Sequence, residues 1–104
     1  MIRVSIFYPN TEGSRFDVDY YVNSHIPMVA GKLKPALKGV WVDRGLSGRA
    51  PDSRPPYVVI AHMLFDSVDA FRQAYAPHAT VFRGDVPNYT DVEPLMQINE
   101  IKLA

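Results

Sequence analysis

The segment from Tyr57 to Phe65 restricts the fold more than any other part of this chain. It follows a loop-like stretch with three prolines and a glycine, residues 47–56, and it ends at Asp66-Ser67. Strand alternation would place Tyr57, Val59, Ala61, Met63 and Phe65 on one face, and Val58, Ile60, His62 and Leu64 on the other. Both faces are apolar apart from His62. A strand of this kind needs cover on both sides of its sheet.

The remaining elements are predicted from alternation, caps and breakers. Further strands are expected at residues 2–8, 40–46 and 95–103. A first helix is expected to open at Ser14, which has capping-box spacing to Asp17, to break near Pro27 and to end at about Leu33. A second helix should begin at Asp66 or Ser67 and reach Tyr75, and a short one between His78 and Thr90 should end at Gly84 and Pro87. The order β-α-β-β-α-β predicts an α+β, ferredoxin-like fold with an antiparallel sheet.

The length of the chain, 104 residues, predicts a single domain spanning 1–104. Two helices can cover only one face of a four-stranded sheet, so the other apolar face needs a different cover. In a chain this short, the simplest cover is a second copy of the same sheet. We therefore expect a homodimer joined through sheet faces.

Composition excludes several classes of protein. Eleven basic and eleven acidic residues cancel, so there is no basic field to attract nucleic acid. The chain has no cysteine, which excludes disulfides, thiolate zinc sites and cysteine-ligated clusters. We see neither a signal peptide at the start nor an apolar run of about 20 residues that could span a membrane. A cytoplasmic protein is the expectation.

The segment 17–28 carries the leading candidates for chemistry. Asp17, Tyr21 and His25 are spaced four residues apart, so consecutive members lie one helical turn apart on one face. Pro27 should push Ile26 away from helical dihedrals and leave His25 beside a break. A neutral imidazole can both donate and accept a proton, which makes His25 a candidate general acid/base with Tyr21 as its hydrogen-bonding neighbour. The alternative is that His25 only satisfies backbone groups freed by Pro27.

A second set of residues is predicted to bind substrate: Tyr20, Trp41, His62, Asn88 and Tyr89. Each has a structural alternative, because aromatic residues and a mid-strand histidine are common in cores and Asn88 suits a turn. The three histidines lack the local spacing of a metal site, so no metal is predicted. No dinucleotide-binding glycine motif, phosphate loop or nucleophile elbow is present, so we expect no tightly bound cofactor.

The order of residues resembles that of a known family. Tyr20-Tyr21-Val22-Asn23-Ser24-His25-Ile26-Pro27-Met28 resembles the Tyr-Tyr-x-x-x-His-x-Pro-Met signature of the EthD family. Segments 7–10, 65–71 and 87–91 also look like segments of that family, in its order and over nearly all of the chain. The resemblance implies a dimeric α+β barrel in which His25 faces an internal cavity. The family is often labelled a reductase, although the sequence offers no dinucleotide site to support that label.

Two functions of different classes are compatible with these residues. The first is a cofactor-independent enzyme, an isomerase, cyclase or oxidoreductase-type protein, acting on a small apolar organic molecule in a cavity between sheet and helices. The second is a non-catalytic accessory or ligand-carrying protein that supports an oxidative degradation system. The two differ at His25, because an enzyme needs this ring to be connected to solvent and to titrate near neutrality, whereas a carrier needs only shape. Haem or metal chemistry ranks last.

Overall fold

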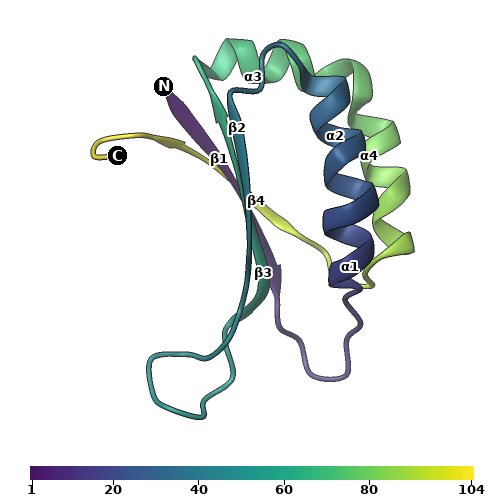
Figure 1. Cartoon of the computed structure of the whole chain (residues 1–104), viewed down its shortest axis with the longest axis vertical. Coiled ribbons are helices and arrows are strands. Elements are labelled where there is room, and N and C mark those ends of the chain that lie inside the picture. The colour runs from purple at the N-terminus through teal and green to yellow at the C-terminus, as the bar shows by residue number, and fades with distance from the viewer.

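The computed structural model describes all 104 residues and consists of one sheet with every helix on the same side (Figure 1). The strands are β1 (Ile2–Pro9), β2 (Gly39–Arg44), β3 (Tyr57–Phe65) and β4 (Leu95–Glu100). Their order across the sheet is β2-β3-β1-β4, and every neighbouring pair is antiparallel. This is the ferredoxin-like arrangement, so the predicted fold class is confirmed.

Two helical units cover one face of the sheet. The first consists of α1 (Val18–Tyr20), the π-helical segment η1 (Tyr21–His25) and α2 (Ile26–Leu33). The second consists of α3 (Val68–Tyr75), η2 (Ala76–His78), α4 (Ala79–Asp85) and η3 (Val86–Asn88). None of these helices combines the length and the apolar character that a bilayer span requires.

The core lies between the helices and the sheet in two neighbouring clusters. One is aliphatic and phenylalanine-rich and contains Ile2, Val4, Val29, Leu33, Met63, Phe65, Phe71 and Phe82. The other is smaller and rich in tyrosine and contains Tyr8, Tyr21, Val59, Ala61 and Tyr89. The tyrosine-rich cluster brings polar hydroxyls into the interior at the end of the sheet where the first helical unit begins.

The first helix begins later than predicted and does not break at the proline. Asp17, not Ser14, is its N-cap, because an Asp17 oxygen accepts a hydrogen bond from the Tyr20 N–H at 3.0 Å. Ile26 keeps helical dihedrals, φ −63° and ψ −44°. The Ile26 N–H bonds to the Tyr21 carbonyl five residues back, so the helix is already widened in front of Pro27 and accommodates its ring. Segment 17–33 is therefore one helical unit with a wide turn in its middle.

Three other sequence expectations need correction. The alternation fails at Tyr57, because a bulge opposite Tyr8 and Pro9 shifts the register and the Tyr57 ring lies 5.2 Å from that of Phe7. The strands β2 and β4 are shorter than predicted, ending before Leu46 and Leu103, whose side chains are free in solvent. The helix α4 passes through Gly84 and ends at Asp85.

The face of the sheet opposite the helices has no cover within the chain (Figure 1). We call it the open face and assign to it, from alternation and register, Arg3, Ser5, Phe7, Trp41, Asp43, Tyr57, Ile60, His62, Leu64, Leu95, Gln97 and Asn99. Trp41 and Leu95 are about half exposed there.

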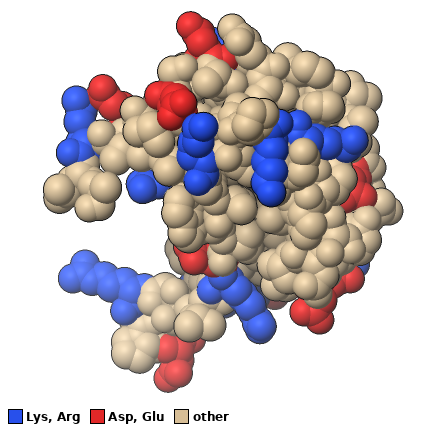
Figure 2. Space-filling view, turned by 45° about the horizontal axis from the view of Figure 1, so that its top comes forward, with Lys and Arg blue, Asp and Glu red and all other residues tan.

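On the face of the molecule seen in Figure 2, Lys and Arg are interspersed with Asp and Glu among uncharged residues.

Candidate active site

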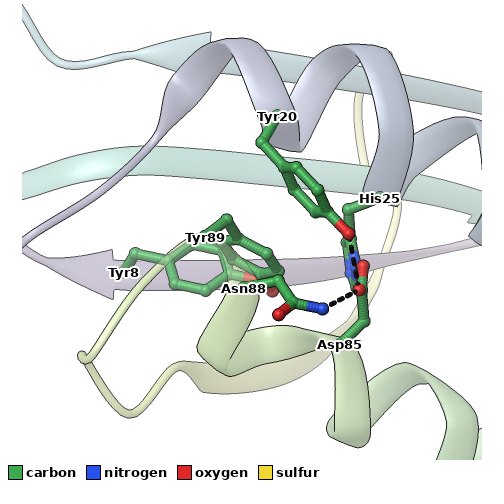
Figure 3. A network of polar contacts seen from close by, with 6 residues as sticks. All are labelled: Tyr8, Tyr20, His25, Asp85, Asn88 and Tyr89. Carbon is green, nitrogen blue, oxygen red and sulfur yellow. Dashed lines mark hydrogen bonds and ion pairs between the residues drawn. The ribbon is translucent and has the colours of Figure 1, made fainter.

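His25 and Asp85 form a hydrogen-bonded contact between the two helical units. His25 ends the π-helical segment and Asp85 ends α4, and His25 Nδ1 lies 2.8 Å from Asp85 Oδ2 (Figure 3). The imidazole side chain is 7% exposed and the Asp85 side chain 17% exposed. Residues far apart in sequence thus meet because both helical units lie on the same face of the sheet.

The other carboxylate oxygen of Asp85 accepts two more hydrogen bonds. The Tyr20 hydroxyl donates to Asp85 Oδ1 at 2.8 Å, and the Asn88 side-chain amide donates to the same oxygen at 2.8 Å. Tyr20 belongs to α1 and Asn88 to η3, so donors from two elements converge on one oxygen (Figure 3). The carboxylate is therefore oriented with its remaining oxygen, Oδ2, toward His25.

The environment leaves one member of the pair neutral and the other ionised. Burial lowers the pKa of His25, and the hydrogen bond and charge of Asp85 offset only part of this effect. Burial alone would raise the pKa of Asp85, but hydrogen bonds from Asn88, His25 and Tyr20 outweigh it and lower that pKa. At neutral pH the ring is then neutral and the carboxylate ionised. Because an ionised carboxylate only accepts, Nδ1 carries the proton and Nε2 holds a free lone pair.

Two tyrosines pack on the imidazole, and a third, Tyr8, lies beside both of them. The Tyr21 ring is stacked against that of His25, with centroids 5.4 Å apart and planes at 17°, and the Tyr89 ring lies 4.6 Å from His25. The Tyr8 and Tyr89 hydroxyls share a hydrogen bond of 2.8 Å. The Tyr21 hydroxyl is buried without a hydrogen-bond partner. Burial raises the pKa of all three phenols, so they remain neutral hydrogen-bonding groups.

A cavity of about 560 Å³ opens beside this cluster. That volume lies within the range of ordinary small-molecule sites, about 300–1,000 Å³. The walls are mostly aliphatic and aromatic, and the only charged side chains besides the titratable His25 are Arg83 and Glu93. The wall residues are Ile6, Tyr8, Tyr21, His25, Ile26, Val29, Ala61, Met63, Tyr75, Phe82, Arg83, Val86, Pro87, Tyr89, Glu93, Pro94 and Met96. The site can hold a small, largely apolar molecule against a single imidazole.

The structure separates the predicted site residues into three groups. His25, Tyr21 and Tyr89 line the cavity together, although Tyr21 meets His25 by ring stacking and not by the expected hydrogen bond. Tyr20 and Asn88 lie behind Asp85 and do not line the cavity. Trp41 and His62 are on the open face, where His62 Nδ1 lies 2.8 Å from Ser5 Oγ. The open face is separated from the cavity by the sheet.

Sequence reasoning missed Asp85 and Tyr8. Asp85 lies 60 residues from His25 and shares no periodic pattern with it. Its one local signal is that it precedes Asn88 by three residues and lies two residues before the family-like segment that starts at Pro87. Tyr8 was assigned only to an alternating strand. No group of three or more His, Asp and Glu side chains is placed to hold a metal ion.

Comparisons with known proteins agree with this description. Residues 14–93 match the model of a family described as the EthD domain. An EthD-like protein from Ralstonia eutropha is 39% identical, with 98% of this chain and 92% of that chain covered and a TM-score of 0.95. None of the curated proteins compared with the chain matches it.

Two more distant structures share the fold. The cofactor-independent oxygenase SnoaB from Streptomyces nogalater is 18% identical, with 99% and 93% of the two chains covered and a TM-score of 0.54. A dimeric ferredoxin-like protein from an uncultured marine organism is 8% identical, with 100% and 97% covered and a TM-score of 0.62. At these identities only the fold is shared. The family match spans most of the chain, and the chain therefore belongs to the EthD domain family.

Proposed function

We propose that this EthD protein binds a small, largely apolar organic molecule in the cavity and transfers a proton on it, with His25 as general base and acid. The observation that carries the proposal is the His25–Asp85 pair. The imidazole ring of His25 is buried, and its Nδ1 lies 2.8 Å from Asp85 Oδ2. His25 also lines a cavity whose other walls are mostly apolar.

The chemistry follows from the charge states of the pair. Nε2 of the neutral ring would accept a proton from an acidic C–H or O–H of the bound molecule, and Asp85 would stabilise the imidazolium that forms. Returning the proton to another atom of the same molecule completes an isomerisation or a cyclisation without any other reactant. The lowered pKa of His25 keeps the ring unprotonated at neutral pH, as a base requires. Tyr21 and Tyr89 pack on the ring and limit its motion.

A non-catalytic carrier is the second candidate, and the apolar character of the cavity walls favours it. A carrier would bind the same class of molecule by shape and would not require proton transfer at His25. Both functions therefore predict that the molecule binds, but only the enzyme predicts that protons of the bound molecule are exchanged.

We propose in addition that a second copy of the chain covers the open face. Phe7, Ile60 and Leu64 are only partly covered there, and Trp41 and Leu95 are half exposed. A stable interface typically buries about 800 Å² on each partner, which is within the reach of a four-stranded sheet. A neighbour of the same fold is itself described as dimeric.

Proton exchange in heavy water tests the catalytic proposal. The protein would be mixed with a panel of small aryl ketones and phenols, binding followed by ligand NMR, and deuterium incorporation by mass spectrometry. We expect His25→Gln to keep binding within a few-fold and to slow exchange by about 10²–10⁴-fold. His78→Gln, a histidine change outside the cavity, should leave both unchanged. Binding without any exchange in the unaltered protein would favour the carrier.

A further inference from the structure

We propose that Tyr20 and Asn88 are positioning residues that fix the carboxylate of Asp85 and, through it, the tautomer of His25. The inference rests on the proposed function, because it concerns the same histidine. It assigns to Tyr20 and Asn88 a role other than contact with substrate. We refer to the two side chains together as the Asp85 clamp.

The two oxygens of Asp85 have different hydrogen-bond partners, and this difference supports the proposed role. Oδ1 accepts from both clamp residues, at 2.8 Å each, and Oδ2 faces His25 Nδ1 at 2.8 Å. A carboxylate free to rotate about its side-chain bonds would exchange these oxygens and could turn to solvent, since the Asp85 side chain is 17% exposed. Two donors on one oxygen restrict that rotation and leave a single orientation for Oδ2.

The clamp residues are themselves held in place. The Tyr20 N–H is bound by the Asp17 side chain at the helix N-cap, and its ring stacks at 6.4 Å and 21° on that of Tyr89. Asn88 lies in the 3-10 turn that follows Asp85 in the chain, three residues away. One donor therefore comes from the helical unit that carries His25 and the other from the unit that carries Asp85.

Neither clamp residue lines the cavity, and Tyr20→Phe keeps the ring that stacks on Tyr89, so an effect of the lost hydroxyl or amide on His25 has to pass through Asp85. Tyr21 from its own helical unit and Tyr89 after η3 also pack on the ring, and Tyr8 from β1 lines the same cavity. All three are neutral phenols. Arg83 and Glu93, the two charged residues of the cavity wall, form no ion pair, which leaves Asp85 as the one charged group bonded to the imidazole.

The tautomer of His25 can be read directly from the ¹⁵N chemical shifts of its two ring nitrogens at about pH 7.5. We expect Nδ1 to be protonated in the unaltered protein and a mixture of tautomers in the Tyr20→Phe/Asn88→Ala double variant. The pKa of His25 should also fall in that variant, because a carboxylate that is no longer held beside the ring favours the imidazolium less. Loss of packing alone would not change which ring nitrogen carries the proton.

Two further variants sharpen the result. Asn88→Asp keeps the shape of the side chain and replaces the donor with a negative charge, so it should shift the tautomer further than Asn88→Ala. Tyr57→Phe removes a hydroxyl on the open face and should leave both His25 signals unchanged. Circular dichroism of each variant confirms that it is folded before its spectra are interpreted.

The outcomes separate this inference from the proposed function. If the double variant keeps Nδ1 fully protonated with an unchanged His25 pKa, while Asp85→Asn changes both, the clamp is refuted and the His25–Asp85 pair stands. If Asp85→Asn also leaves the tautomer unchanged, Asp85 does not orient the ring and the proposed proton transfer loses its basis. A mixture in the double variant and in Asp85→Asn supports both proposals.

Discussion

In the proposed mechanism, the charge state of His25 depends on two opposing effects on its pKa. Burial disfavours the imidazolium, and Asp85 favours it, with burial the larger effect. The result is a ring that stays neutral at physiological pH and has an ionised partner to stabilise a transient proton. Without Asp85, the same burial would make protonation of the ring costlier and the ring a weaker base.

The stability of the protein should depend on pH through His25. The folded pKa of His25 is lower than its unfolded value of about 6.5, so the unfolded state takes up the proton first as pH falls. Stability is then fully present above about pH 6.5 and decreases as pH falls from there toward the folded pKa. Asp85 contributes to this change only near and below its unfolded pKa of about 3.8, because its folded pKa is lowered further. Urea titrations between pH 5 and 7.5 therefore measure how the free energy of unfolding depends on His25, without a contribution from Asp85.

The matched comparison for the pH effect is His25→Gln against His78→Gln. The first variant should lose the decline in the free energy of unfolding between pH 7.5 and 5 that comes from the buried ring. The second should retain it, because His78 lies outside the cluster. Parallel curves for His25→Gln and the unaltered protein would show that another group causes the decline.

Two buried tyrosines should respond in opposite ways to loss of their hydroxyls. The Tyr21 hydroxyl has no partner, so Tyr21→Phe should raise the free energy of unfolding by about 1 kcal/mol. Tyr89→Phe removes the bond to Tyr8 and leaves the Tyr8 hydroxyl unpaired, which should cost about 1–3 kcal/mol. Urea unfolding at pH 7.5 measures both. Equal losses in the two variants would mean that Tyr21 has a hydrogen-bond partner in solution.

The elements that bear the site show what the sequence can and cannot predict. The strand β3 was predicted with its observed bounds, and the Ser67 cap of α3 was one of two alternatives, because both depend on local pattern. The sequence does not predict the π-helical turn at 21–25, because hydrogen bonds that span five residues leave no mark on the spacing of about four residues between side chains on one helix face. For the same reason the sequence predicts a break at Pro27. Local rules assume an ordinary helix in front of the proline.

The site was only half predictable for a related reason. Tyr21, His25 and Tyr89 were identified from a short motif and a family-like segment. Asp85 depends on how the second helical unit lies across the sheet, which is a tertiary property. Tyr20 and Asn88 are predicted to bind substrate, because sequence spacing does not reveal that a carboxylate lies between them and the ring.

The two faces of the sheet differ in what covers them. One face of the sheet carries all the helices and the cavity, and the open face carries aromatic and aliphatic side chains with a polar centre at Ser5 and His62. A charge on this face should therefore affect assembly without reaching the cavity. The proposed assembly and the proposed ligand binding belong to opposite sides of one sheet.

Placing a charge on the open face tests the proposed dimer. Leu64 lies on this face, whereas Met63 points to the buried helical side, so Leu64→Asp is the informative change. Light scattering after size exclusion should show a dimer for the unaltered protein and a monomer or aggregate for Leu64→Asp, because an unpaired buried charge costs several kcal/mol. Leu46→Asp, at a side chain that is 88% exposed, should remain dimeric. A monomeric mass for the unaltered protein at micromolar concentration would refute the dimer.

The chain has one tryptophan, and it lies on the open face with its indole folded over Gly39. A methyl group at position 39 would come within 2.7 Å of that ring, so the glycine is needed for this placement. Because Trp41 is half exposed and the cavity lies beyond the sheet, its fluorescence is a built-in optical probe of whatever covers this face. Dilution that separates two copies should move the emission maximum to longer wavelength, while occupation of the cavity should leave the spectrum in place.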